Sequence, residues 1–296
     1  MEKASAMVSS IFGGSTSTEA AATISSIFIY PIKSCRGISV PQASITPTGL
    51  RWDRQWLVVN SKGRAYTQRI EPKLALVQVE LPSEAFHEDW EPTSESYLVL
   101  KAPGMDILKV SLSKTCEKIE GVSVWEWSGS ALDEGAEASE WFSNYLGKPS
   151  RLVHFNTATE ARAVDPDFAP GYRTMFSDGY PFMLLSQGSL DALNKLLKEP
   201  VPVNRFRPKR SRFTKIRIVP TINQDNGIAG QEPTETLVNF RSDKVLRPTR
   251  KQQGKVYFGQ NLVCKESLTD GKGKVIKVGD PIYVLKKVST RVDAAA

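Results

Sequence analysis

The chain has 296 residues, of which 40% are hydrophobic, so one large domain or two moderate ones with a substantial core are expected. Its formal net charge of +7 favours an anionic partner without identifying it. Three cysteines without a close pair argue against a disulfide scaffold and a Cys-x-x-Cys zinc site, and two histidines exclude a multi-histidine metal site.

Residues 1–24 are rich in Ala, Ser, Thr and Gly and contain no arginine. We therefore expect a disordered tail here, with no clear secretory signal or mitochondrial transit peptide. No apolar stretch reaches the roughly eighteen residues that a membrane helix needs, so no transmembrane segment is expected. A soluble, cytoplasmic protein is the default interpretation.

Short strand patterns dominate the chain up to residue 125. We predict strands at 27–30, 56–60, 64–67, 74–81, 97–100, 107–110 and 122–125. Segment 135–146 differs, because its apolar residues fall at i, i+3, i+4, i+7 and i+8, with Gly147 following as a stop. This spacing predicts an amphipathic helix that packs on the core.

The second half of the chain returns to strands after a long irregular loop at 156–180. Ser186 or Ser189 can cap a helix with apolar residues Leu190, Leu193 and Leu197, and 234–240 can form a second short helix. Further strands are predicted at 151–155, 182–185 (buried), 201–206, 213–219, 256–264, 275–278 and 282–287. The fold class is mainly β (α+β), with antiparallel connections that favour barrels.

Basic side chains accompany these strands. Lys33 and Arg36 follow the first strand, and Arg54 precedes the strand at 56–60. Seven of the thirteen residues at 205–217 are basic, and no acid lies between them. Because arginine binds phosphate at two points and lysine adds a point charge, this layout predicts a binding site in which several segments contact one anionic ligand. A solvated basic face is the alternative interpretation of 209–217.

Several other functions are disfavoured. No Gly-x-Gly-x-x-Gly or Walker-type loop is present, which argues against dinucleotide and P-loop chemistry. Within the basic segment only Phe206 and Phe213 are aromatic, and two aromatic side chains are few for stacking on bases. Nucleic acid is therefore not expected as a partner. If 201–206 is a strand, Arg205 and Arg207 point to the same face.

Six motifs occur in a fixed order: Tyr-Pro-Ile-Lys-Ser-Cys-Arg-Gly at 30–37, Trp-Asp-Arg-Gln-Trp at 52–56, Arg-Leu-Val-His-Phe at 151–155, Arg-Phe-Arg-Pro at 205–208, Phe-Gly-Gln-Asn at 258–261 and Val-Gly-Asp-Pro at 278–281. Together they resemble MOSC-domain proteins of the two-part kind, and most closely the plant relatives of the mitochondrial amidoxime-reducing component. The resemblance implies a MOSC N-terminal β-barrel domain at 25–150, a MOSC β-barrel domain with few helices at 151–290 and a tail at 291–296.

This resemblance also implies a function. The family binds a molybdenum cofactor, a pterin with a terminal phosphate, and reduces N-hydroxylated compounds such as amidoximes with electrons from cytochrome b5 and cytochrome b5 reductase. It implies a mitochondrial location, and the chain is too short for the pyridoxal-phosphate domain of molybdenum-cofactor sulfurases. By motif, the implied cofactor-binding residues are Lys33, Ser34, Arg54, Gly179, Tyr180, Arg207, Ser211 and Asn261.

One position departs from the family. Relatives supply a cysteine thiolate to the molybdenum, but this chain has Phe213 or Arg217 there, depending on whether Ser211 or Pro220 sets the register. A strand–turn–strand segment after Pro208 is also missing, so no metal ligand and no catalytic residue are assigned. Three explanations stay open: an altered splice form or gene model, a cofactor-binding relative without redox activity, or another thiol such as Cys35. A non-catalytic cofactor carrier, a sulfur-relay module or an inactive isoform is therefore the alternative function.

Overall fold

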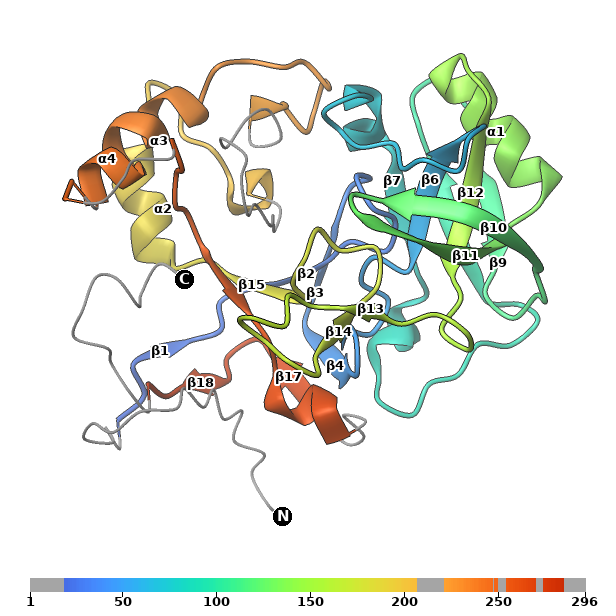
Figure 1. The fold of residues 1–296 in the computed structure, drawn as a ribbon, viewed down its shortest axis with the longest axis horizontal. Coiled ribbons are helices and arrows are strands. Elements are labelled where there is room, and N and C mark those ends of the chain that lie inside the picture. Colours follow the sequence, from blue (N-terminus) through green and yellow to red (C-terminus); the bar gives the residue numbers. More distant parts are fainter. Residues whose placement is uncertain (1–18, 207–220, 247, 250–253, 270–273, 285–296) are drawn as a thin grey trace.

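The computed structural model describes residues 19–206, 221–246, 248–249, 254–269 and 274–284. Within these ranges the protein is mainly β with few helices, as predicted (Figure 1). The strands form separate sheets of two to four strands each, and no closed barrel is present among the described residues. The closure of the two predicted barrels therefore stays a prediction.

The largest sheet has the strand order β10-β11-β12-β6 and is antiparallel throughout. Its members are β6 (Trp56–Asn60), β10 (Glu117–Val124), β11 (Trp127–Asp133) and β12 (Ser150–Phe155). Successive residues of β6 point to opposite faces, so Trp56 and Val58 join one hydrophobic core while Leu57 and Val59 join another. This strand is therefore buried on both faces.

Helix α1 (Ala136–Leu146) packs against this sheet (Figure 1). The five apolar residues whose spacing predicted the helix are all buried, and Gly147 ends it in the left-handed conformation at φ 70°. Both features confirm the prediction from the sequence.

A second sheet, in the order β7-β8-β9, contains β7 (Gln78–Glu80), β8 (Tyr97–Lys101) and β9 (Leu108–Ser111). The β8–β9 hairpin confirms the predicted strands at 97–100 and 107–110. The single strand predicted at 74–81 is wrong in its first half, because a 3-10 helix (Pro72–Leu76) occupies that stretch. Proline fixes φ at the start of this turn, which favours a helical geometry over an extended one.

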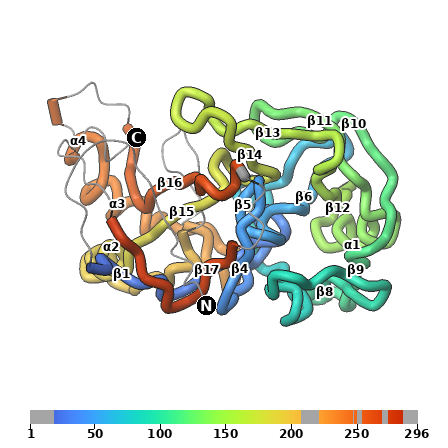
Figure 2. Tube along the Cα trace, turned by 90° about the horizontal axis from the view of Figure 1, so that it is seen from below, coloured from blue at the N-terminus to red at the C-terminus, as the bar shows by residue number. Residues whose placement is uncertain are grey.

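Strands from the beginning and the end of the described chain pair with one another, and β4 and β17 lie side by side in Figure 2. Strand β4 (Gln42–Thr46) lies between β5 (Gly49–Leu50) and β17 (Val275–Lys277), while β1 (Ala22–Thr23) pairs with β18 (Pro281–Ile282). Nearby, β2 (Ile27–Ile29) pairs with β3 (Ile38–Val40). The domain limits at 25–150 and 151–290 and the two terminal tails stay predictions.

The remaining elements lie in the second half of the chain. The strand pairs are β13 (Arg162–Ala163) with β14 (Arg173–Thr174), and β15 (Phe182–Leu184) with β16 (Gln260–Leu262). The helices are α2 (Gln187–Asn194), α3 (Thr234–Arg241) and α4 (Asp243–Leu246). Ser186 caps α2 by accepting a hydrogen bond from the Ser189 backbone N–H, as predicted, and α2 and α3 contribute to a third hydrophobic core.

Three strand predictions in this half are corrected. Segment 201–206 contains a 3-10 helix (Val203–Arg205) instead of a strand, so strand alternation does not orient Arg205 and Arg207. Strand β15 is not buried, because β16 is the one strand paired with it in the described chain and Leu184 is exposed. The strand predicted at 256–264 is reduced to β16, and the one at 213–219 lies outside the described residues.

Candidate functional site

The first two sequence motifs lie side by side. The Arg54 backbone N–H donates to the Tyr30 carbonyl at 2.8 Å, and the Lys33 N–H donates to the Trp56 carbonyl at 2.8 Å. Ile32 also forms a parallel bridge with Trp56. These main-chain contacts bring the predicted cofactor-binding residues Lys33 and Arg54 into one region.

The Lys33 ammonium is buried, with the residue only 6% exposed. Its Nζ donates to the Phe176 carbonyl at 2.8 Å and forms an ion pair with Asp178. Burial lowers the pKa of Lys33 from 10.5 to about 8; Asp178 opposes this shift, and the charges of Arg162 and Arg54 add to it. Lysine has three N–H donors, and the described residues account for two of them, so the third can donate to a ligand.

Arg54 is also buried and is held by its neighbour in the chain. Its Nη1 donates to Asp53 Oδ1 at 2.6 Å, and the guanidinium lies 4.4 Å from the centre of the Tyr30 ring. The backbone of Arg54 has φ 50°, a left-handed conformation that a residue with a side chain rarely adopts. Such strain is concentrated at functional sites, where the surrounding structure maintains it.

Arg162 is the third buried cation of this region, and none of the six sequence motifs contains it. Its Nη1 donates to the Met175 carbonyl at 2.8 Å and to the Ser177 carbonyl, which fixes the loop that carries Asp178. We call Lys33, Arg54 and Arg162 the cation cluster. Asp178 pairs with Lys33 and Asp53 pairs with Arg54, and three cationic side chains brought together in this way suit an anionic group such as phosphate.

Ser34 lies beside the cluster in a left-handed conformation at φ 72°. The Gln68 side chain donates to the Ser34 carbonyl at 2.7 Å and is hydrogen bonded to the Gln224 side chain at 3.2 Å. Arg36 donates to the Gln224 carbonyl and pairs with Asp225 at 3.1 Å. Segment 221–225, which follows the position of the missing cysteine in sequence, therefore contacts the motif at 30–37 directly through Arg36.

The other predicted site residues are placed as follows. Gly179 is buried and Tyr180 is half-buried, and both directly follow Asp178 in the chain. Asn261 is half-buried in β16, opposite Met183 of β15. The rest lie outside the described residues: Arg207, Ser211, Phe213 and Arg217. The structure thus brings Lys33, Ser34 and Arg54 together, while Asn261 lies on β16, the partner of the strand that follows Tyr180 in the chain.

None of the three cysteines is suited to act as a thiolate. Cys35 is fully buried in the first hydrophobic core, where a charged thiolate would lose its hydration. Burial and Glu134 raise the pKa of Cys116 to about 12, and burial raises that of Cys264 to about 11. No group of three or more potential metal ligands (His, Cys, Asp, Glu) occurs in the described part of the chain.

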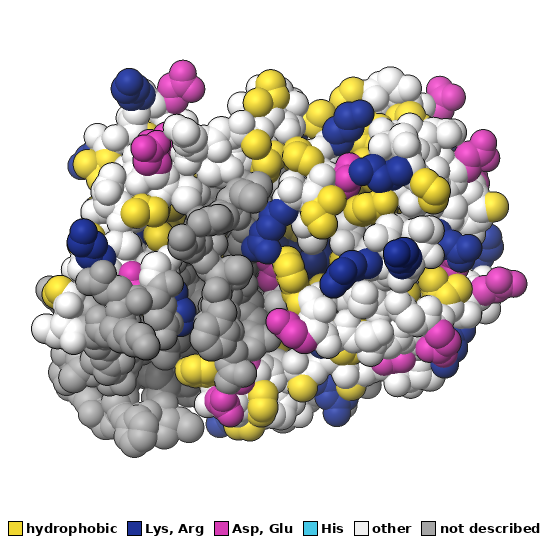
Figure 3. All heavy atoms as spheres, turned by 45° about the horizontal axis from the view of Figure 1, so that its top comes forward, with side chains coloured by type: hydrophobic (Ala, Val, Ile, Leu, Met, Phe, Trp, Pro, Cys, Tyr) yellow, Lys and Arg dark blue, Asp and Glu magenta, His cyan; other side chains and the backbone are white. Residues whose placement is uncertain are grey.

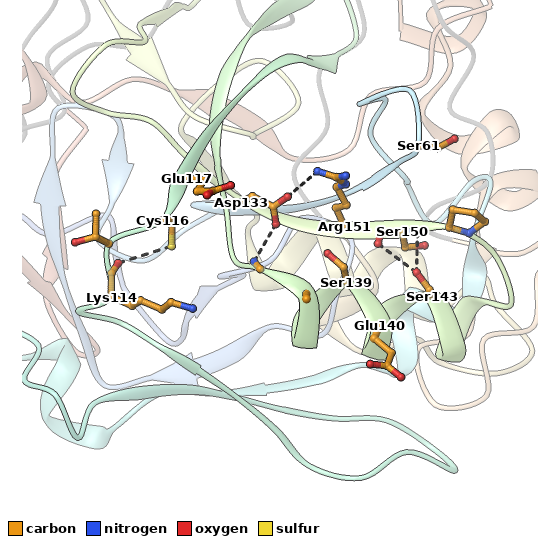
Figure 4. Close-up of a pocket in the computed structure, with 14 residues that line it drawn as sticks. Ser61, Lys114, Cys116, Glu117, Asp133, Ser139, Glu140, Ser143, Ser150 and Arg151 are labelled. Carbon is orange, nitrogen blue, oxygen red and sulfur yellow. Dashed lines mark hydrogen bonds and ion pairs between the residues drawn. The ribbon is translucent and has the colours of Figure 1, made fainter.

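A separate pocket of about 830 Å³ opens at the beginning of α1 (Figure 4). Its lining includes Lys114, Cys116, Asp133 and Arg151, and none of the cation cluster. Asp133 pairs with Arg151 at 2.9 Å, and the other charged residues of the lining are Lys114, Glu117 and Glu140, so basic side chains do not outnumber acidic ones. This pocket therefore lacks the concentration of basic side chains that marks the cation cluster.

Basic side chains are also prominent on the surface. On the face drawn in Figure 3, Lys and Arg side chains gather across the middle and the right-hand part, with hydrophobic side chains between them. This distribution agrees with the net charge of +7. No helix in the described ranges is long and apolar enough to cross a membrane.

Comparisons with known proteins agree with this picture. Residues 21–149 match the model of the MOSC N-terminal beta barrel domain. The chain is 32% identical to mitochondrial amidoxime reducing component 2 of Bos taurus, covering 88% of this chain and 82% of that one. It is 30% identical to mitochondrial amidoxime-reducing component 1 of Homo sapiens, covering 89% and 83%. A Bordetella bronchiseptica protein solved in solution is 30% identical over 42% of this chain, but its TM-score of 0.28 adds nothing on the fold.

The mainly β fold and the match at 21–149 define a protein with a MOSC N-terminal β-barrel domain. Because the identity reaches 32% over most of both chains, the protein belongs to the family of the mitochondrial amidoxime-reducing components. This confirms, at the level of the family, the resemblance carried by the six motifs.

Proposed function

We propose that this protein binds a molybdenum cofactor and belongs, by chemistry as well as ancestry, to the oxidoreductases that reduce N-hydroxylated compounds. The cation cluster carries the proposal, since three buried cationic side chains from separate segments of the chain lie together there. Lys33, Ser34 and Arg54 would hold the pterin phosphate from one side, and Arg207 and Ser211 from the other. The lining of the site would come from Gly179, Tyr180 and Asn261.

The described residues suit an anion in three ways. The Lys33 ammonium has a third N–H donor for it, Arg54 is fixed by Asp53, and Arg162 holds the loop around Asp178. Buried and preorganised, these groups bind phosphate without having to be ordered on binding. When bound, the molybdenum centre supplies the two electrons that, with two protons, convert an N-hydroxyl group to N–H and water. Cytochrome b5 and cytochrome b5 reductase are the proposed electron donors.

A second function is favoured by one specific observation. Phe213 or Arg217 stands where relatives place the metal-binding cysteine, and the thiol groups of Cys116 and Cys264 have raised pKa values. The protein would then hold the cofactor by its phosphate end without turnover, as a carrier or an inactive isoform. The mitochondrial location and the plant origin stay predictions that rest on the relatives and the motifs.

The test is the molybdenum and pterin content of protein purified from cells that make the cofactor. Wild-type protein should carry both, Lys33→Met should lose most of both, and the same change at the exposed Lys62 should have no effect. Cofactor-free wild-type protein would refute the proposal. Amidoxime reduction with cytochrome b5 and its reductase then separates enzyme from carrier, and the transcript across codons 204–222 shows whether a cysteine-bearing exon is absent.

A further inference from the structure

Trp125 occupies a turn position that suits glycine better. Strands β10 and β11 are joined by a two-residue turn, because Val124 pairs with Trp127. Trp125 has φ 56°, while Glu126 does not have a positive φ. A two-residue hairpin turn with a positive φ at its first position is normally occupied by glycine there. A large aromatic side chain in this conformation costs free energy, so its contacts outside the turn call for an explanation.

Those contacts lead to the cation cluster. The Trp125 indole N–H donates to Asp178 Oδ1 at 3.2 Å, and the same oxygen pairs with Lys33. The ring centre lies 5.9 Å from Lys33 Nζ and 4.9 Å from the Arg69 guanidinium. The Lys33 side chain is 7% exposed and that of Asp178 15%, whereas Trp125 is 42% exposed. The indole therefore covers the buried ion pair and still presents part of its ring to solvent.

We propose that Trp125 is a specificity-determining residue, whose exposed ring stacks on the planar part of a neutral aromatic amidoxime beside the cation cluster. The inference rests on the proposed function for the ligand class. An indole ring prefers planar partners, which it stacks in an offset or edge-to-face arrangement. Lys33 and Arg69, whose charged groups lie 5.9 Å and 4.9 Å from the ring centre, disfavour a ligand that carries positive charge at this position. An uncharged amidoxime is therefore selected over the cationic amidine that its reduction yields.

A purely structural role for Trp125 makes a different prediction for stability. Trp125→Gly removes the contacts of the ring with Asp178, Lys33 and Arg69 but relieves the turn, so the thermal unfolding midpoint should change little while ligand affinity falls. If the ring only held the hairpin in place, the same substitution would lower the midpoint. Trp127 of the same hairpin is the matched control, since its ring packs against Phe155 at 5.5 Å and Phe176 at 6.1 Å within a hydrophobic core.

The experiment measures binding of benzamidoxime, of its non-planar cyclohexyl analogue and of benzamidine by titration calorimetry on the full chain. Wild-type protein and Trp127→Phe should prefer benzamidoxime to both. Trp125→Phe should keep most of this preference, and Trp125→Gly should bind benzamidoxime at least roughly fivefold more weakly, as expected for a lost stacking contact. Unchanged affinity in Trp125→Gly, equal losses for the planar and non-planar ligands, or no benzamidoxime binding by wild-type protein would overturn the proposal.

Molybdenum is measured in the same preparations, which separates the two proposals. Trp125-dependent binding in protein that carries no molybdenum supports the stacking role and refutes cofactor binding. Full molybdenum content with Trp125-independent binding refutes the stacking role alone.

Discussion

The lowered pKa of Lys33 predicts that anion binding depends on pH in a range where most proteins show no change. The free protein holds this ammonium with a pKa of about 8, because burial opposes the charged form. A bound phosphate dianion supplies a further counter-charge and moves the pKa back towards 10.5. Binding is therefore accompanied by proton uptake above about pH 8, so phosphate affinity falls as the pH rises.

The size of the effect follows from the two pKa values. Between about pH 7.5 and about pH 9.5, affinity for inorganic phosphate should fall roughly 20-fold, or about 1.8 kcal/mol, if the bound pKa is near its ordinary value. The second ionisation of inorganic phosphate is more than half complete at the start of this range, so it changes the affinity far less than the titration of Lys33 does. Titration calorimetry at several pH values measures the slope.

Stability of the ligand-free protein should change in the opposite direction. Since the folded pKa of Lys33 lies below the unfolded one, the cost of burying the charge is fully present below about pH 8 and disappears as pH rises towards 10.5. Relative to Lys33→Met, the wild-type protein should gain about 3 kcal/mol across that window in denaturant unfolding. A phosphate affinity that is flat with pH, or an equal slope in Lys33→Met, would refute the assigned role of Lys33.

Three further outcomes are expected. Arg162→Met should lower the free energy of unfolding by about 3 kcal/mol, measured by chemical denaturation, because the carbonyls of the loop around Asp178 lose a charged donor. Phe142→Ala should cost about 4 kcal/mol in the same assay through a cavity between α1 and its sheet, whereas a cost below about 1 kcal/mol would contradict its full burial. If Pro220 sets the register, Arg217→Cys should add a sulfur ligand to the molybdenum of cofactor-loaded protein, detected by X-ray absorption, and Phe213→Cys should not. If Ser211 sets it, the two variants should behave the other way round.

Local sequence patterns predict an element correctly where one face of that element packs on the core and the apolar spacing records that face. The spacing of apolar residues predicts α1, and the apolar run at 56–60 predicts β6, because each pattern reflects a face that must be covered. The same approach fails at 201–206, where Val201 and Phe206 are buried through a 3-10 turn instead of a strand. Short apolar runs do not distinguish these geometries without their tertiary partners.

Sequence motifs mark only some of the residues of the candidate site. Lys33, Ser34 and Arg54 are marked by motifs, and main-chain pairing of two neighbouring segments brings them together. Arg162 and Trp125 are not marked, because their roles depend on a loop more than ten residues away from Arg162 and fifty from Trp125. The positive φ at Trp125 leaves no signal in the sequence, and strand β11, which makes this turn part of a hairpin, was not predicted.

The pairing of β1 with β18 and of β4 with β17 has a consequence for biosynthesis. Strands near residues 22 and 43 find their partners near residues 282 and 276, so these contacts form only after almost the whole chain has left the ribosome. Until then the edge of β4 stays open to other chains, and the high contact order slows its closure. A chain that stops translation before residue 275 should therefore be retained by chaperones or aggregate, even though most of its core residues are already present.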